Sequence, residues 1–185
     1  SRARGFLLGA TAGRTTLNGE GLQHEDGHSH LISATIPNCI SYDPCFAYEL
    51  AVIIQNGLER MIQNQEDIYY YITLMNENYQ HPDMPKNIEK NIIQGIYKFS
   101  ESKLKGPKVQ LMGSGAILRE VIEAAKLLES EWKISADVYS VTSFTELRRE
   151  ALDNERWNML NPDKKQKTSL IQEIISDQES PIIAS

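Results

Sequence analysis

The stretch KVQLMGSGAILREVIEAAKLLESEWKISADVYSV, residues 108–141, decides the fold class. The segment from Lys108 to Met112 predicts a strand, and Gly113-Ser114-Gly115 predicts a tight turn after it. The helix that follows has one apolar face, formed by Ile117, Leu118, Val121, Ile122, Ala125 and Leu128. A second strand is expected from Ile134 to Val141. A strand, a helix and a strand in this order form a βαβ unit, so the sequence predicts an α/β fold with mostly parallel sheets flanked by helices.

The first half of the chain predicts the same alternation. Strands are expected from Ile36 to Tyr42 and from Ile68 to Met75, where three consecutive tyrosines give the aromatic content of a strand. Between them, Asp43-Pro44 predicts the start of a helix that runs to about residue 63, because Asp favours the N-cap and Pro the first helical position. Residues 10–33 are rich in Gly, Thr and His and predict a long loop, which is usually functional when it is ordered.

Irregular sequence separates the two halves. Two prolines and two asparagines preclude regular structure at 76–85, and only a short helix from Lys86 to Gln94 and a strand near Ile96 to Phe99 are expected before residue 107. We therefore predict two partial domains joined by a linker region, with the divisions 1–84, 85–106 and 107–185.

The end of the chain carries two helix-start signals. Ser143 and Glu146 have the spacing of a capping box, which predicts a helix to about residue 153. Ser169 and Gln172 predict a second capping box, for a helix that ends near residue 176. A last short strand is expected at 181–184.

The composition excludes some function classes. A net charge of −6 disfavours nonspecific nucleic-acid binding, and no apolar run approaches the roughly 20 residues of a membrane helix. The spacing of Cys39 and Cys45 matches neither a C-x-x-C redox pair nor a zinc knuckle, so we expect buried free thiols in a reducing cytoplasm. The chain starts without Met, its first residues hold no apolar stretch long enough for a signal peptide, and we expect it to be a fragment of a longer protein.

Three of the four histidines, His24, His28 and His30, lie within seven residues, where chemistry is most expected. The H-E-x-x-H pattern from His24 to His28 binds zinc only on a helix, and five glycines between residues 9 and 27 argue against one. Two other interpretations remain open. The loop does acid–base or electrostatic work on a bound substrate, or its side chains only bond backbone groups.

Residues 13–30, GRTTLNGEGLQHEDGHSH, resemble the signature loop of the homodimeric-type E1 component of pyruvate dehydrogenase. Further blocks of the chain agree with this resemblance, namely IPNCISYDP at 36–44, residues 69–79, residues 137–147 and ERWNML at 155–160. The likeness spans essentially the whole chain.

The resemblance implies both a fold and an activity. Residues 1–84 would be the later half of a middle, pyrimidine-binding domain, and residues 107–185 the first half of a transketolase C-terminal-like domain. The family uses thiamine diphosphate and Mg²⁺ to decarboxylate pyruvate, and it passes the acetyl group to the lipoyl group of the E2 acyltransferase. The cofactor carries the carbanion chemistry, and protein groups position and protonate. The parent protein would be a homodimer in the bacterial cytoplasm.

The resemblance also implies site residues. His24 matches a histidine that lines the family's active centre, where it would contact substrate groups and deliver protons during acetyl transfer. Glu20 matches an active-centre glutamate that keeps His24 placed and protonated. Three further residues are expected to support His24 and Glu20 without contacting the substrate themselves, namely Asn18, Asp26 and His28.

The family's G-D-G…N motif, which holds diphosphate and Mg²⁺, does not occur in this sequence. The family's active centre also forms between two subunits, so we expect this chain alone neither to bind the cofactor tightly nor to turn over pyruvate. Three alternatives remain. They are another thiamine-diphosphate enzyme, such as a transketolase-like or other 2-oxo acid dehydrogenase E1, a non-catalytic dimerisation or partner-binding fragment, and a zinc hydrolase.

Overall fold

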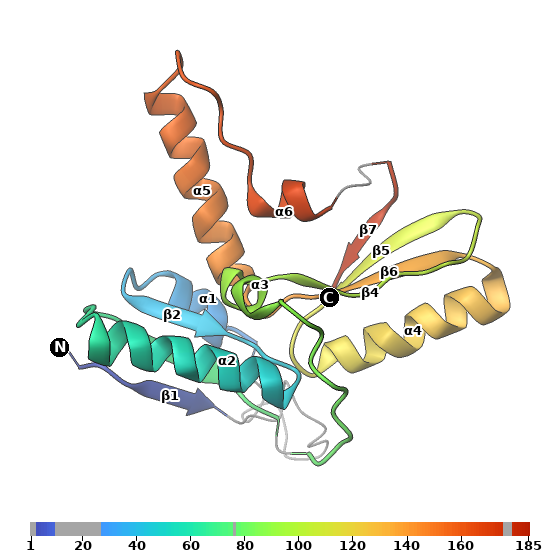
Figure 1. Ribbon diagram of the computed structural model, residues 1–185, viewed down its shortest axis with the longest axis horizontal. Helices are drawn as coiled ribbons and strands as arrows, with labels where there is room; N and C mark the ends of the chain where they lie inside the picture. Colours follow the sequence, from blue (N-terminus) through green and yellow to red (C-terminus); the bar gives the residue numbers. More distant parts are fainter. Residues whose placement is uncertain (1–2, 10–26, 76, 176–178) are drawn as a thin grey trace.

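The computed structural model describes residues 3–9, 27–75, 77–175 and 179–185 and contains two sheets flanked by helices (Figure 1). The first sheet has three parallel strands in the order β1-β3-β2. These strands are β1 (Phe6–Gly9), β2 (Cys39–Tyr42) and β3 (Tyr69–Thr73). In the central strand, Tyr70 lies opposite Phe6 of β1 and Tyr69 lies opposite Cys39 of β2. The two strands predicted in this half are confirmed.

Different helices cover the two faces of β3, because successive side chains of a strand point to opposite faces. Tyr70 and Ile72 are fully buried and pack in one apolar cluster with α2 (Ala47–Leu58) and the π-helical turn η3 (Glu59–Gln63) that continues it. Tyr71 and Thr73 point the other way, and His30 of α1 (Ser29–Ala34) contacts both.

Helix α1 corrects the prediction of a loop through residue 33. It has six residues, and no side chain caps its N-terminus at His28. A helix this short depends on packing rather than on propensity, and therefore leaves little signal in the sequence.

The start of α2 is a second correction. The helix begins at Ala47 with Phe46 as its N-cap residue, and not at Asp43-Pro44. The carboxylate of Asp43 accepts hydrogen bonds from other elements instead, and Glu49 accepts from the backbone N–H groups of Cys45 and Phe46 at 2.6 and 2.9 Å. Glu49 thus provides the acceptor that Asp43 was expected to provide.

The second sheet has the strand order β4-β6-β5-β7. Its strands are β4 (Tyr97–Ser100), β5 (Lys108–Gly113), β6 (Ser135–Ser140) and β7 (Ile182–Ala184). β5 is parallel to both of its neighbours, and β4 is antiparallel to β6. The segment expected as a linker, 85–106, holds α3 (Glu89–Gln94) as well as β4, so it contributes one strand to the second sheet.

The chain reverses its winding direction at β5. Helix α4 (Ile117–Trp132) connects β5 to β6 on one side, and α5 (Phe144–Leu160) with α6 (Leu170–Ile174) leads to β7 on the other side. The apolar clusters place these connections on opposite faces of the sheet, since Leu111 packs with α4 and Met112 with Leu147 of α5. In open α/β sheets, such a reversal leaves a crevice outside the carboxyl ends of the strands.

The predicted helix starts in the second half are confirmed. The Ser143 hydroxyl oxygen accepts from the Glu146 N–H at 3.0 Å, and Ser169 forms a capping box with Gln172. Helix α5 runs to Leu160, beyond the expected end near residue 153.

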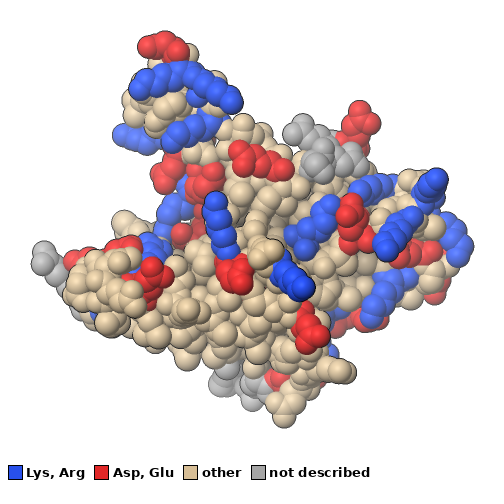
Figure 2. Space-filling model, viewed as in Figure 1, with Lys and Arg blue, Asp and Glu red and all other residues tan. Residues whose placement is uncertain are grey.

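Helix α5 projects from the body of the molecule (Figure 1). Figure 2 shows lysine and arginine side chains gathered at its outer end, whereas the face over α2 is largely uncharged. In the part of the chain that the structure describes, no helix is long and apolar enough to cross a membrane.

Candidate active site at the carboxyl ends of the strands

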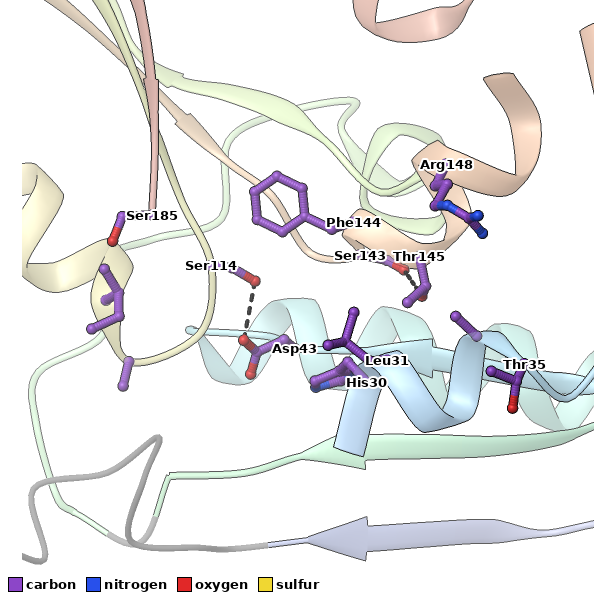
Figure 3. A pocket seen from close by; sticks show the side chains of 13 residues that line it. His30, Leu31, Thr35, Asp43, Ser114, Ser143, Phe144, Thr145, Arg148 and Ser185 are labelled. Carbon is purple, nitrogen blue, oxygen red and sulfur yellow. Dashed lines mark hydrogen bonds between the residues drawn. The ribbon is translucent and has the colours of Figure 1, made fainter. Parts of the chain in front are cut away.

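A cavity of about 630 Å³ opens where the carboxyl ends of strands from both sheets meet (Figure 3). Helix α1 forms one wall, and the turn after β5 together with the start of α5 forms the opposite wall. Leu31, Ile117 and Phe144 give the lining an apolar part, and His30 and Arg148 give it a titratable and a cationic group. A cavity of this size, mostly apolar with a few polar groups, is typical of a small-molecule site.

Asp43 joins the two sheets at the base of this cavity and is 6% exposed. Its backbone N–H donates to the Thr142 carbonyl at 2.8 Å, and its carbonyl accepts from the Gly115 N–H at 3.0 Å. Its carboxylate accepts from the hydroxyls of Thr73 and, at 3.1 Å, of Ser114. One residue therefore bonds to β3 of the first sheet and to the turns after β5 and β6 of the second.

The turn after β5 requires glycine next to Asp43. Gly115 has φ +50°, a left-handed conformation, and a Cβ atom there would lie 2.6 Å from Cγ of Asp43. The Gly-Ser-Gly sequence is thus explained by a tight turn and by the close approach of a carboxylate.

His30 reaches from α1 to two hydroxyl groups of the first sheet. Its Nδ1 lies 3.1 Å from Oγ of Ser41, and its Nε2 lies 3.0 Å from Oγ1 of Thr73. The ring also packs against Tyr71, with the ring centroids 5.3 Å apart. These contacts fix the imidazole at the edge of the cavity, half-buried, between groups that can both donate and accept hydrogen bonds.

Three hydroxyl groups extend this arrangement into α5. The Ser41 and Thr145 hydroxyls lie 2.9 Å apart, and the Ser143 and Thr145 hydroxyls lie 3.0 Å apart. Ser143 also donates to the carbonyl of Ser41 at 2.6 Å. The start of α5 is therefore held against the end of β2.

Glu49 supports the loop that carries Asp43. Its carboxylate is fully buried and accepts four hydrogen bonds, two from backbone N–H groups and two from the hydroxyls of Tyr97 and Ser140. Burial raises the pKa of Glu49 above its ordinary 4.5, although these donors lower it in part. Because Tyr97 and Ser140 belong to the second sheet, Glu49 is a second buried link between the two sheets.

Neither cysteine is positioned for nucleophilic chemistry. Both Cys39 and Cys45 are buried free thiols, as the sequence predicts. Burial, together with the nearby Glu49 charge, raises the pKa of the Cys45 thiol to about 12. A thiol that stays protonated at neutral pH is a poor nucleophile.

Most of the predicted site residues cannot be placed. Asn18, Glu20, His24 and Asp26 lie outside the described residues, so their roles stay predictions. His28 is described, and it is an exposed residue directly before α1 that does not line the cavity.

Two residues of the cavity were not selected from the sequence as site residues. The sequence marked His30 only as one of three clustered histidines, and it marked Asp43 as a helix cap. A usable signal existed for Asp43, because it directly follows a predicted parallel strand, and ligands bind beyond the carboxyl ends of such strands. In the ranges 3–9, 27–75, 77–175 and 179–185, no three His, Cys, Asp or Glu side chains group as metal ligands. The zinc alternative depends on His24, so the structure does not test it.

Known proteins resemble this chain along its whole length. It matches the family model of the pyruvate dehydrogenase E1 component middle domain over residues 1–82 and that of the transketolase-like TK C-terminal domain over residues 95–185. It is 61% identical to the pyruvate dehydrogenase E1 component of Pseudomonas aeruginosa and 58% identical to that of Escherichia coli K12, with 100% of the chain aligned in both cases. The chain belongs to the pyruvate dehydrogenase E1 component family. This E1-family chain spans about 21% of the length of these relatives.

Solved structures with the same fold include two transketolases. The enzyme of Campylobacter jejuni has a TM-score of 0.66 and 18% identity, over 97% of this chain and 23% of that one. The enzyme of Leishmania mexicana has a TM-score of 0.65 and 14% identity, over 96% and 22% of the two chains. At these identities the likeness concerns the fold alone, and it confirms the predicted α/β class for this E1-family chain.

Proposed function

We propose that the parent protein is the E1 component of a bacterial pyruvate dehydrogenase complex. It would decarboxylate pyruvate oxidatively and transfer the acetyl group to the lipoyl group of E2. The observation that carries this proposal is the identity of 51 to 61% to E1 components over essentially the whole chain. The proposal includes action as a homodimer in the cytoplasm.

Within that enzyme, this chain would supply one wall of the active centre. The described cavity lies at the carboxyl ends of parallel strands, where α/β folds bind ligands. The residues we propose for catalysis are His24 and Glu20. We propose that Asn18, Asp26 and His28 support these two residues. We keep the division into a middle domain at 1–84 and a transketolase C-terminal-like domain at 107–185 as part of this proposal.

The described residues do not fit a complete cofactor site. Asp43 and Glu49, the buried carboxylates that link the two sheets, already accept hydrogen bonds from neighbouring hydroxyls and N–H groups. Among the described residues, they do not belong to a cluster of side chains that could hold Mg²⁺. Thiamine diphosphate would supply the carbanion chemistry, and its diphosphate and Mg²⁺ would be held by residues that are not in this sequence. The 185-residue chain alone should therefore bind thiamine diphosphate weakly. Tight, Mg²⁺-dependent binding in a calorimetric titration would contradict this part of the proposal.

The transketolase-like fold supports a second candidate, a thiamine-diphosphate enzyme with another substrate. Substrate profiling of the full-length protein separates the two candidates. We expect decarboxylation of pyruvate and acetyl transfer to a lipoyl domain. Turnover of sugar phosphates or 2-oxoglutarate without turnover of pyruvate would favour the second candidate.

A further inference from the structure

The hydrogen bonds around His30 form one continuous chain across the junction of the two sheets. From α5 to the base of the cavity, its members are Thr145, Ser41, His30, Thr73 and Asp43. Thr145 lines the cavity at one end, and the Asp43 carboxylate closes the other end (Figure 3). The direction in which each group donates its hydrogen bond decides whether this row of hydrogen bonds can carry a proton.

The end at Asp43 has a fixed direction. The Thr73 hydroxyl has a single hydrogen, which it donates to the Asp43 carboxylate, an acceptor without a proton of its own when ionised. Oγ1 of Thr73 must then accept from His30, so the Nε2 atom of His30 carries a hydrogen. The neutral imidazole is thereby assigned the tautomer in which Nδ1 is the acceptor.

At the Thr145 end, the direction of the hydrogen bonds can reverse. When His30 is neutral, the Ser41 hydroxyl donates to Nδ1, and the single Thr145 hydrogen points either to the Ser41 hydroxyl or to the Ser41 carbonyl, which lies 3.0 Å from Thr145 Oγ1. When Nδ1 is protonated, it donates to Ser41, and Ser41 donates to Thr145. Every group in the chain is satisfied in both states, and only the hydroxyl hydrogens of Ser41 and Thr145 change place.

We propose that His30 is the proton-relay residue of this cavity, which exchanges one proton with a bound substrate oxyanion through Ser41 and Thr145. The proton on Nδ1 passes to Ser41, the Ser41 proton passes to Thr145, and the Thr145 proton passes to the oxyanion. Imidazolium becomes neutral imidazole and the oxyanion becomes a hydroxyl, so protons and charge balance. The choice of a 2-oxo acid as the source of the oxyanion rests on the proposed function.

The charged groups that face His30 suit this role. Asp43 lies beyond Thr73 and places a carboxylate on the Nε2 side of the ring. Arg148 of α5 lines the same cavity and favours a substrate anion there. Tyr71 of β3 packs against the ring, and His28 precedes α1 by one residue. Ile117 of α4 and the preceding residue Ala116 also line the cavity and carry no charge.

The direct test is the tautomer of His30 in the full-length protein, read from ¹⁵N-histidine NMR during a pH titration. The His30 signals are identified by their loss in His30→Gln. We expect hydrogen on Nε2 in the neutral form, and we expect Thr73→Val to weaken this preference while Thr73→Ser retains it. A neutral His30 with its hydrogen on Nδ1 overturns the proposal, and this readout does not depend on enzymatic activity.

The kinetic test uses the pH profile of kcat for pyruvate oxidation by the full-length enzyme. We expect His30→Gln and Ser41→Ala each to lower kcat by at least about tenfold and to remove one ionisation between about pH 5 and 8. His81→Asn is the matched control, because His81 lies in the irregular segment after β3 and its Nδ1 accepts from the Ala47 N–H at the start of α2. It should leave the profile unchanged. Profiles of His30→Gln and Ser41→Ala that match the wild type overturn the relay, whereas a wild type inactive on pyruvate overturns the proposed function and leaves the NMR test to decide.

Discussion

Gly115→Ala tests whether Asp43 is the joint between the two sheets. An alanine at φ +50° costs about 1 to 2 kcal/mol relative to glycine. The new Cβ atom would lie 2.6 Å from Cγ of Asp43, so the carboxylate must move away from Thr73 or Ser114. A hydrogen bond to a charged group contributes about 1.5 to 3 kcal/mol. The sum predicts a fall of about 2.5 to 5 kcal/mol in the free energy of unfolding.

The assay is urea unfolding of the 185-residue protein followed by circular dichroism. Gly5→Ala is the matched control, because no atom lies within 4 Å of a Cβ at this position and its backbone is not left-handed. The control should change the free energy of unfolding by less than about 0.5 kcal/mol. If Gly115→Ala is as stable as this control, Asp43 does not hold the junction in the way described.

Two other changes test the core and the buried carboxyl group. Because burial raises the pKa of Glu49, its contribution to stability is fully present below about pH 4.5 and is lost as the pH rises through the folded-state pKa. Glu49→Gln should remove this loss, and urea midpoints measured over a pH series check it; equal pH dependence in both proteins would contradict the expectation. Leu118→Ala should cost about 2 to 5 kcal/mol because Leu118 is 0% exposed in the core below α4, whereas Leu127→Ala on the same helix, at 54% exposure, should cost little. Equal midpoints for the two leucine variants would refute the packing of α4.

The spacing of apolar, capping and aromatic residues in the sequence predicts most of the fold. The stripe that includes Leu118 and Val121 predicts α4, since these side chains are buried against the strands. Ser143 predicts the start of α5, because capping is a local interaction between residues close in sequence. The tyrosine run predicts β3, although only Tyr70 of the three is fully buried.

The residues of the junction were harder to predict, because their roles depend on contacts distant in sequence. Asp43 has the local signature of an N-cap, but its acceptor capacity is used by Thr73 and Ser114, which are 30 and 71 residues away. His30 could not be separated from its neighbouring histidines until α1 placed it beside Ser41 and Thr73. The antiparallel pairing of β4 with β6 likewise has no local signal.

The measurement that tests the central claim most directly is reductive acetylation of an isolated E2 lipoyl domain by the full-length protein, with pyruvate, thiamine diphosphate and Mg²⁺. We predict acetyl transfer by the wild type and a loss of at least about 100-fold in His24→Ala, as expected for a group that delivers protons. A wild-type protein that fails to acetylate the lipoyl domain from pyruvate would contradict the proposed function. Equal rates for the wild type and His24→Ala would contradict the active-centre role of the histidine loop.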